Sequence, residues 1–239
     1  MIIAIDAGNS RIKWGVHDGS RWLDSGVLAT ADVVWLAEAA DEWPAAASAV
    51  VCNVAGASVA ASLSSVLAGR RTAVSFLHAS AAACGVRNAY DSPAQLGADR
   101  WAALIGARAE SDSACLVVCA GTATTVDLLD AEGVFQGGLI LPGFELMRAA
   151  LARNTAQLPL ANGVFRAAPR NTMDAIVSGC LQAQLGAIER MFAGIADAAG
   201  ARCLLTGGAA ARLVEHLQIP FRLVDNLVLN GLVRYAVTR

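Results

Sequence analysis

The chain has 239 residues, enough for one large domain or two smaller ones with a substantial buried core. Its formal net charge is -2 and it has no run of Lys or Arg, so we expect no nucleic-acid partner, because such partners are held by phosphate neutralisation. Hydrophobic residues make up 56% of the chain, but polar residues interrupt every apolar run before the roughly 20 residues that span a bilayer, so no membrane partner is expected.

The N-terminus runs directly into a strand-like segment, MIIAID, without the basic region and cleavage site of a signal peptide, which favours a cytoplasmic protein. Strands are predicted over 1–7, 11–17 and 22–29, between turn signals. A helix is then predicted from Ala31 to about Trp43, with a capping start at Thr30.

The next segments alternate between strand and helix, which is typical of a sheet flanked by helices. SAVVCNVAG predicts a buried strand and SVAASLSSVLAG the helix behind it. Turn formers dominate 79–97, and ADRWAALIGARAE resumes helical periodicity. We place the boundary between two halves in this helix, with an N-terminal domain over 1–105 and a C-terminal domain over 106–239.

The second half repeats the plan of the first. A hairpin of CLVVCA and TTVDLLD is followed by a third strand, VFQGGLILPG, and a helix, FELMRAALARN. A long helix is predicted from about Asn171 to Ala199. A strand and Gly-rich turn in ARCLLTGGAA, a helix over 209–217, FRLVDN and a final helix complete the chain.

Two hairpins of similar sequence are the most informative feature: IIAIDAGNSRIKWGV at 2–16 and CLVVCAGTATTVDLL at 115–129. Each places small, hydrogen-bonding residues at its turn. This repetition suggests two related halves that face one shared ligand, for which we expect a nucleotide triphosphate. The turn LTGGAA at 205–210, where a strand ends in two glycines before a helix, adds a candidate adenosine site.

The first turn carries groups suited to a metal-bound phosphate. Gly8 permits positive φ and close approach of the backbone, while Asn9 and Ser10 offer donors. Asp6 supplies the hard oxygen that Mg²⁺ prefers, and Lys13 a cation. The alternative is an ordinary tight hairpin whose polar residues serve only the turn.

Cysteine and histidine offer little support for a zinc site or a Ser/His/Asp triad. The six cysteines lie mostly in apolar runs without a C-x-x-C pair, and the three histidines are far apart in sequence. We interpret the cysteines as buried free thiols.

The segments DAGNSRIKWG, RNAYDSPAQLGADRWAALIGA, GTATTVD, GGLILPG, NTMDAIVSG and LTGGAA, in this order, resemble the type III pantothenate kinases. That family belongs to the group of acetate and sugar kinases, Hsp70 and actin. The resemblance covers essentially the whole chain, and its most specific part is the LGADRW block. It implies an α/β fold with two duplicated ribonuclease H-like domains, each a mixed sheet flanked by helices, around an ATP cleft.

The resemblance also implies site residues and a reaction. The implied ATP phosphate loop consists of Asp6, Ala7, Gly8, Asn9, Ser10, Arg11, Ile12 and Lys13, with Asp6 near Mg²⁺, and Thr122 is the implied phosphate contact of the second hairpin. Asp99 is the implied general base, and the implied pantothenate contacts are Tyr90, Gly97, Ala98, Asp99, Arg100 and, from across a homodimer, Thr172. The implied reaction converts ATP and pantothenate to ADP and 4′-phosphopantothenate, the first step of coenzyme A biosynthesis.

The local chemistry of Asp99 and Arg100 agrees with these roles. A carboxylate within hydrogen-bond reach can orient an alcohol and accept its proton, and an Arg can pair with a substrate carboxylate in a two-pronged fork. Without the resemblance, an Asp at a helix N-terminus that interacts with the helix dipole explains the pair equally simply.

One departure from the family concerns a monovalent cation. Members that depend on potassium or ammonium have an Asp two positions before the Gly of the second hairpin, where this chain has Cys119. A neutral thiol is a poor potassium ligand, so the site is in doubt here. Two other functions stay open: a non-catalytic accessory or regulatory protein on the same nucleotide-binding scaffold, and a kinase for another small hydroxy acid or sugar.

Overall fold

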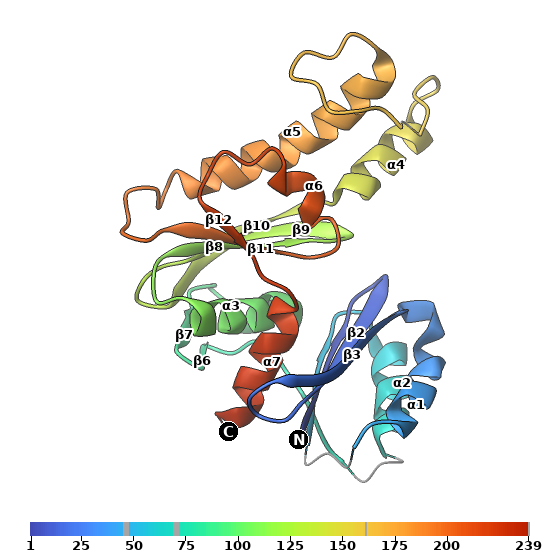
Figure 1. The fold of residues 1–239 in the computed structure, drawn as a ribbon, viewed down its shortest axis with the longest axis vertical. Helices are drawn as coiled ribbons and strands as arrows, with labels where there is room; N and C mark the ends of the chain where they lie inside the picture. The colour runs from blue at the N-terminus through green and yellow to red at the C-terminus, as the bar shows by residue number, and fades with distance from the viewer. Residues whose placement is uncertain (45–47, 69–71, 161, 239) are drawn as a thin grey trace. The chain divides into compact units, whose positions relative to one another are not determined.

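The computed structural model in Figure 1 describes residues 1–44, 48–68, 72–160 and 162–238. The chain divides into two compact units. Unit 1 comprises Met1–Asp112, Glu132–Gln136 and Asn226–Arg239, and unit 2 comprises Ser113–Ala131 and Gly137–Asp225. The C-terminal segment therefore packs with the N-terminal half of the chain, while the domain division at residues 105 and 106 stays a prediction.

Unit 1 contains a five-stranded mixed sheet in the order β3-β2-β1-β4-β5. Its strands are β1 (Ile2–Ala7), β2 (Arg11–His17), β3 (Trp22–Ala29), β4 (Ser48–Asn53) and β5 (Ala73–Phe76). Its helices are the 3-10 helices η1 (Thr30–Trp35) and η2 (Pro93–Gln95) and the α-helices α1 (Leu36–Asp41), α2 (Ala57–Ala68), α3 (Ala98–Glu110) and α7 (Leu227–Val237). Two short strands, β6 (Ala82–Ala83) and β7 (Val86–Asn88), form a small hairpin.

Helices pack on both faces of the unit 1 sheet, which explains why β1 is apolar on both faces. Ile3 and Ile5 of β1 belong to one core with Leu36 of α1 and Leu63 of α2. Helix α7 packs against β1 and β4, and its closest helical neighbour is α3 (Figure 1). These two helices approach closely because they meet at glycines, and a side chain at Gly231 would collide with the backbone of α3.

Unit 2 contains five strands, in the order β12-β11-β8-β9-β10, of a seven-stranded sheet that continues into β7 and β6. Its strands are β8 (Cys115–Ala120), β9 (Ala123–Leu129), β10 (Val134–Pro142), β11 (Arg202–Thr206) and β12 (Phe221–Leu223). The first residues of β10 belong to unit 1, where they pair with β7. Helices α4 (Phe144–Asn154) and α5 (Thr172–Phe192) cover one face of this sheet, and the short α6 (Ala210–Val214) packs beside α5.

The two sheets share one topology. Numbered within its own half, each sheet has the strand order 3-2-1-4-5. In both, the first strand is antiparallel to the second and parallel to the fourth, which is in turn parallel to the fifth. Parallel pairs require a crossover, and helices provide it in each half. The expectation of a duplicated fold with mixed sheets flanked by helices is confirmed.

The structure corrects two predicted helices and adds a strand that was not predicted. The helix expected from Ala31 is a 3-10 helix followed by α1, because Asp32 has non-helical backbone angles, and Thr30 makes no capping bond. The helix expected to reach Ala199 ends at Phe192, and the turn after it contains Gly194 and Gly200, the latter at positive φ. The strand β5 was not predicted, because it is short and only partly buried.

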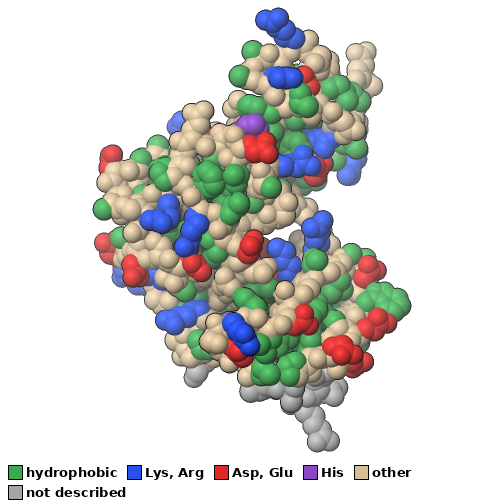
Figure 2. Space-filling view, in the orientation of Figure 1, with side chains coloured by type: hydrophobic (Ala, Val, Ile, Leu, Met, Phe, Trp, Pro, Cys, Tyr) green, Lys and Arg blue, Asp and Glu red, His purple; other side chains and the backbone are tan. Residues whose placement is uncertain are grey.

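On the face drawn in Figure 2, positively and negatively charged side chains are interspersed over the described residues. No helix in the described part of the chain is long and apolar enough to cross a membrane. All six cysteines are free thiols; four are buried, and Cys84 and Cys119 are partly exposed.

Candidate active site

The β1–β2 hairpin places Asp6 directly opposite Lys13 on one face of the sheet. Its turn is closed by the N–H of Gly8, which donates to the carbonyl oxygen of Arg11 (3.0 Å). The expected positive φ at Gly8 is wrong, since Gly8 is not among the residues with left-handed backbone. Gly8 instead permits close packing, because a Cβ there would lie 3.3 Å from the same carbonyl oxygen.

Asp99 lies close enough to Asp6 to affect its ionisation. The pKa of Asp6 is raised from 3.8 to about 6, first by burial and second by the negative charge of Asp99. Lys13 and a hydrogen bond from the thiol of Cys52, the neighbour of Asp6 on β4, oppose this rise. The hairpin and the start of α3 therefore place two carboxylates and one ammonium group in a single polar cluster.

The start of α3 sets the position of Asp99. The helix begins at Ala98, so Asp99 lies in the first turn, where the helix dipole favours a negative charge. The backbone N–H of Arg100 donates to Oδ1 of Asp99 (2.8 Å). Gly97 leaves room for that carboxylate, because a Cβ at position 97 would lie 2.6 Å from Oδ1.

Arg100 is buried and packs against two aromatic rings. Its Nη1 donates to the hydroxyl of Tyr90 (2.9 Å), and its guanidinium carbon lies 5.6 Å from the ring centroids of both Tyr90 and Phe135. The two rings are themselves 5.1 Å apart. The loop that carries Tyr90 is closed by Asn88, which accepts from the N–H of Tyr90 and donates to the carbonyl of Pro93.

Most of the expected site residues thus fall in unit 1. The phosphate loop, from Asp6 to Lys13, and the acceptor residues Tyr90 and 97–100 occupy the hairpin, the loop after β7 and the start of α3. The structure brings together Asp6 with Asp99, and Arg100 with Tyr90. Thr122 and Thr172 belong to unit 2 and lie in different elements of it.

Thr122 lies in a turn of unit 2 that is lined by glycines. It is exposed in the β8–β9 turn, and its carbonyl oxygen accepts from the N–H of Gly143 (2.8 Å). At the end of the adjacent strand β11, Gly207 has a φ of +104° and packs against the backbone of Ala120. Any side chain at Gly143 or Gly207 would collide with this backbone. The backbone is therefore uncovered by side chains at the adjacent ends of β8 and β11, and nucleotides bind at such strand ends in α/β sheets.

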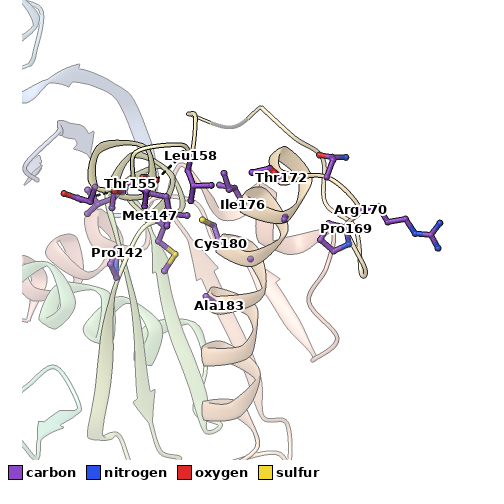
Figure 3. Close-up of a pocket in the computed structure, with 17 residues that line it drawn as sticks. Pro142, Met147, Thr155, Leu158, Pro169, Arg170, Thr172, Ile176, Cys180 and Ala183 are labelled. Atoms are coloured by element: carbon purple, nitrogen blue, oxygen red, sulfur yellow. Dashed lines mark hydrogen bonds between the residues drawn. The ribbon is translucent and has the colours of Figure 1, made fainter.

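Thr172 is the first residue of α5 and lines an apolar groove between α4 and α5, about 1070 Å³ in volume (Figure 3). The start of the helix is fixed by Asn171, whose side chain accepts from the N–H of Asp174 and donates to its carboxylate (both 2.9 Å). Oδ1 of Asp174 also accepts from the N–H of Val164 (2.9 Å). Thr122 does not line this groove.

Three further residues contact the expected site residues and were not identified from the sequence. They are Thr30, which contacts the phosphate hairpin, Cys52, which contacts Asp6, and Phe135, which contacts Arg100 and Tyr90. Phe135 is far from its partners along the chain, and its sequence context gave no signal. Strand periodicity could have placed Cys52 beside Asp6, but only once the pairing of β1 with β4 was known.

The donor set of unit 1 fits a divalent cation that is bound mainly through substrate phosphates. No cluster of three or more His, Cys, Asp or Glu capable of holding a metal ion occurs within the described ranges. The carboxylate of Asp6 has a neighbouring negative charge whose repulsion a cation would relieve. Mg²⁺ commonly uses one or two carboxylates together with phosphate oxygens, so Asp6 meets this requirement.

Comparison with known proteins decides the family. Residues 2–194 match the sequence profile of the type III pantothenate kinases. The chain belongs to the type III pantothenate kinase family. It is 62% identical over 232 residues to the type III pantothenate kinase of Aromatoleum aromaticum, covering 97% of this chain and 96% of the relative. It is 48% identical over 237 residues to that of Dechloromonas aromatica, covering 99% of each chain.

Solved structures at lower identity share the fold of this member of the type III pantothenate kinase family. A putative Baf family transcriptional activator from Campylobacter jejuni superposes with a TM-score of 0.65 at 20% identity, covering 99% of this chain and 98% of its own. A putative 2-dehydro-3-deoxygalactonokinase from Sinorhizobium meliloti gives 0.66 at 17% identity, covering 100% and 99%. The family expected from the sequence is confirmed.

Proposed function

We propose that this enzyme transfers the γ-phosphoryl group of ATP to pantothenate, giving 4′-phosphopantothenate and ADP at the start of coenzyme A biosynthesis. The observation that carries the proposal is the electrostatic contact between Asp6 of the phosphate hairpin and Asp99 at the start of α3. Phosphoryl transfer requires an acceptor hydroxyl to be held in line with the γ-phosphate, and a carboxylate beside the phosphate site serves that need.

In this proposal the hairpin binds the ATP phosphates through its backbone N–H groups and Lys13, and Asp6 holds Mg²⁺. When bound, Mg²⁺ neutralises negative charge on the phosphates. Thr122 is the proposed phosphate contact of the second hairpin. The glycine-lined backbone at 205–210 is the proposed adenosine contact, supported by the positive φ at Gly207.

Asp99 is the proposed general base. Its carboxylate accepts a hydrogen bond from the backbone N–H of Arg100 and occupies the space that a side chain at position 97 would fill, and these two features define its orientation. An ionised carboxylate so placed orients the hydroxyl of the acceptor and takes its proton as the new bond to phosphorus forms.

The proposed acceptor site is formed by Tyr90, Gly97, Ala98 and Arg100. A guanidinium carries five donors, so the bond to Tyr90 is compatible with a fork to the carboxylate of pantothenate.

A homodimer in which Thr172 reaches the acceptor site of the partner subunit is part of the proposal, supported by the exposure of Thr172 beside the apolar groove. Light scattering that gave the mass of one chain would contradict the dimer. The expected cytoplasmic location belongs to the same proposal.

The test is a coupled assay of ADP release with pantothenate, compared with glucose, acetate and glycerate. We expect ADP release with pantothenate as the acceptor and none with glucose, acetate or glycerate. Nucleotide binding without any turnover would favour a non-catalytic accessory protein, and turnover with a different acceptor would change the substrate.

The same assay tests the base. Asp99→Asn is expected to leave ATP affinity nearly unchanged and to lower kcat by at least about a hundredfold, the usual effect of losing a general base. Near-normal turnover in this variant would remove Asp99 from the catalytic role.

A further inference from the structure

Thr30 binds the turn of the phosphate hairpin at two points. Its hydroxyl donates to the carbonyl oxygen of Gly8 (2.6 Å), and its backbone N–H donates to the carbonyl oxygen of Ser10 (3.1 Å). The residue is buried, with only 9% of its surface exposed. One side chain and one backbone group, both from the junction of β3 and η1, therefore fix two carbonyl groups of a three-residue turn.

The hydroxyl of Thr30 does not serve the helix that it begins. The residue at the cap position of η1 is Ala29, which makes no side-chain capping bond. The short bond to Gly8 is thus the interaction that the structure gives this hydroxyl. A buried Thr at this point binds the hairpin and not its own helix.

These two bonds determine where the amides of the turn point. In a trans peptide the C=O and the following N–H point in opposite directions. Because the carbonyls of Gly8 and Ser10 are directed to Thr30, the N–H groups of Asn9 and Arg11 are directed away from it. Backbone N–H groups that point to one place attract an anion, whereas a carbonyl oxygen that points to the same place repels the anion with its partial negative charge.

We propose that Thr30 is a positioning residue for nucleotide phosphates: it holds the carbonyls of the turn on the protein side so that the amides of Asn9 and Arg11 face the phosphate. This inference rests on the proposed function, in which the hairpin binds the phosphates of ATP. Thr30 itself need not touch the nucleotide. Its effect is therefore specific to the phosphate part of the ligand.

The test compares nucleotides with and without phosphates. Thr30→Val keeps the shape of the side chain but removes the donor, and Thr30→Ser retains the donor. Calorimetry in Mg²⁺ buffer without pantothenate is expected to show about tenfold weaker binding of ATP and ADP to Thr30→Val, the scale of one lost hydrogen bond at a buried acceptor, with adenosine binding unchanged. Thr30→Ser is expected to stay within about twofold of the unmodified enzyme.

The matched control is Thr72→Val, the same change at another buried threonine of unit 1, which is expected to leave all three affinities unchanged. Unaltered binding of ATP and ADP by Thr30→Val, or an equal loss for adenosine, would overturn the inference. If Thr30→Val does not fold, amide NMR of the unmodified enzyme decides: ADP, but not adenosine, is expected to shift the Asn9 and Arg11 resonances strongly, and unshifted resonances overturn the inference.

The inference and the proposed function fail in different ways. A phosphate-specific defect in Thr30→Val, together with no turnover of pantothenate by the unmodified enzyme, contradicts only the proposed acceptor. Full pantothenate turnover by the unmodified enzyme, together with normal ATP affinity in Thr30→Val, contradicts only the role of Thr30.

Discussion

Arg100 donates a hydrogen bond of 2.9 Å to the hydroxyl of Tyr90 while its guanidinium also lies over the Tyr90 ring. The two residues come from the start of α3 and from the loop after β7, and Phe135 of β10 packs against both. A buried guanidinium held by an aromatic ring and a hydroxyl loses little further freedom when it binds a carboxylate. This contact therefore pre-organises the proposed acceptor site.

Tyr90→Phe tests that organisation. The variant keeps the ring against Arg100 and Phe135 but loses the hydroxyl, leaving one guanidinium N–H of Arg100 without this acceptor. We expect the KM for pantothenate to rise about tenfold with kcat changed less than about threefold, because the loss affects binding of the acceptor in ground and transition states alike. Steady-state kinetics measure both constants. A fall in kcat at unchanged KM would show that the hydroxyl acts in the chemical step instead.

Gly97→Ala tests the placement of Asp99. The new Cβ would lie 2.6 Å from Oδ1 of Asp99, and a flexible carboxylate moves aside more easily than backbone. We expect kcat to fall by about tenfold or more while the melting temperature changes little, since a small misplacement of a reacting group is costly. Gly186→Ala is the matched control, because a Cβ there meets no atom within 4 Å. Equal kcat in the two variants would contradict the role of Gly97.

Asp6→Asn tests the cost of the buried carboxylate. An acid whose pKa is raised by folding from 3.8 to about 6 costs no stability below pH 4, where it is protonated in both states; the cost develops as the pH rises from about 4 to 6 and is fully present above 6. This corresponds to at most about 3 kcal/mol, and we expect about 1–2 kcal/mol because Asp6 retains some exposure. In metal-free buffer at pH 8, urea unfolding should therefore show Asp6→Asn to be more stable than the unmodified enzyme.

The control is the pH dependence of the stability that Asp6→Asn gains over the unmodified enzyme. The advantage of Asp6→Asn should shrink as the pH is lowered toward 4, where Asp6 is protonated in the folded state. A gain that is independent of pH would show that the carboxylate charge is not its cause. The same variant should lose Mg²⁺-dependent ATP affinity, because it lacks the proposed metal ligand.

Cys119 leads to a prediction about monovalent cations. Its neighbours in register are Thr125 on β9 and Thr206 on β11, so a carboxylate is absent from this row of three residues. We expect activity with Mg²⁺ and little or no change in rate when sodium is replaced by potassium, since potassium prefers oxygen ligands. Cys119→Asp is the informative variant, in which potassium should stimulate turnover. A severalfold potassium stimulation of the unmodified enzyme would overturn this prediction.

The sequence predicted the elements around the hairpins well because their signals are local. Alternating apolar residues between turn formers located β1, β2 and β3, and the repeated hairpin predicted the duplicated topology. It failed where a local signal was overruled by packing. Thr30 looks like a helix cap in sequence, yet the cap position is Ala29, and the Thr30 hydroxyl donates to the carbonyl oxygen of Gly8 in the hairpin turn.

What the sequence by itself determined was the family, the pair of hairpins and the candidate residues Asp6, Asp99 and Arg100, because motif and periodicity are written in neighbouring positions. Only the tertiary structure decided that Asp99 raises the pKa of Asp6 and that Phe135 packs against Arg100. The physical reason is that these effects depend on distance in space. Sheet pairing and helix packing bring together residues that lie far apart along the chain, and no local pattern records that distance.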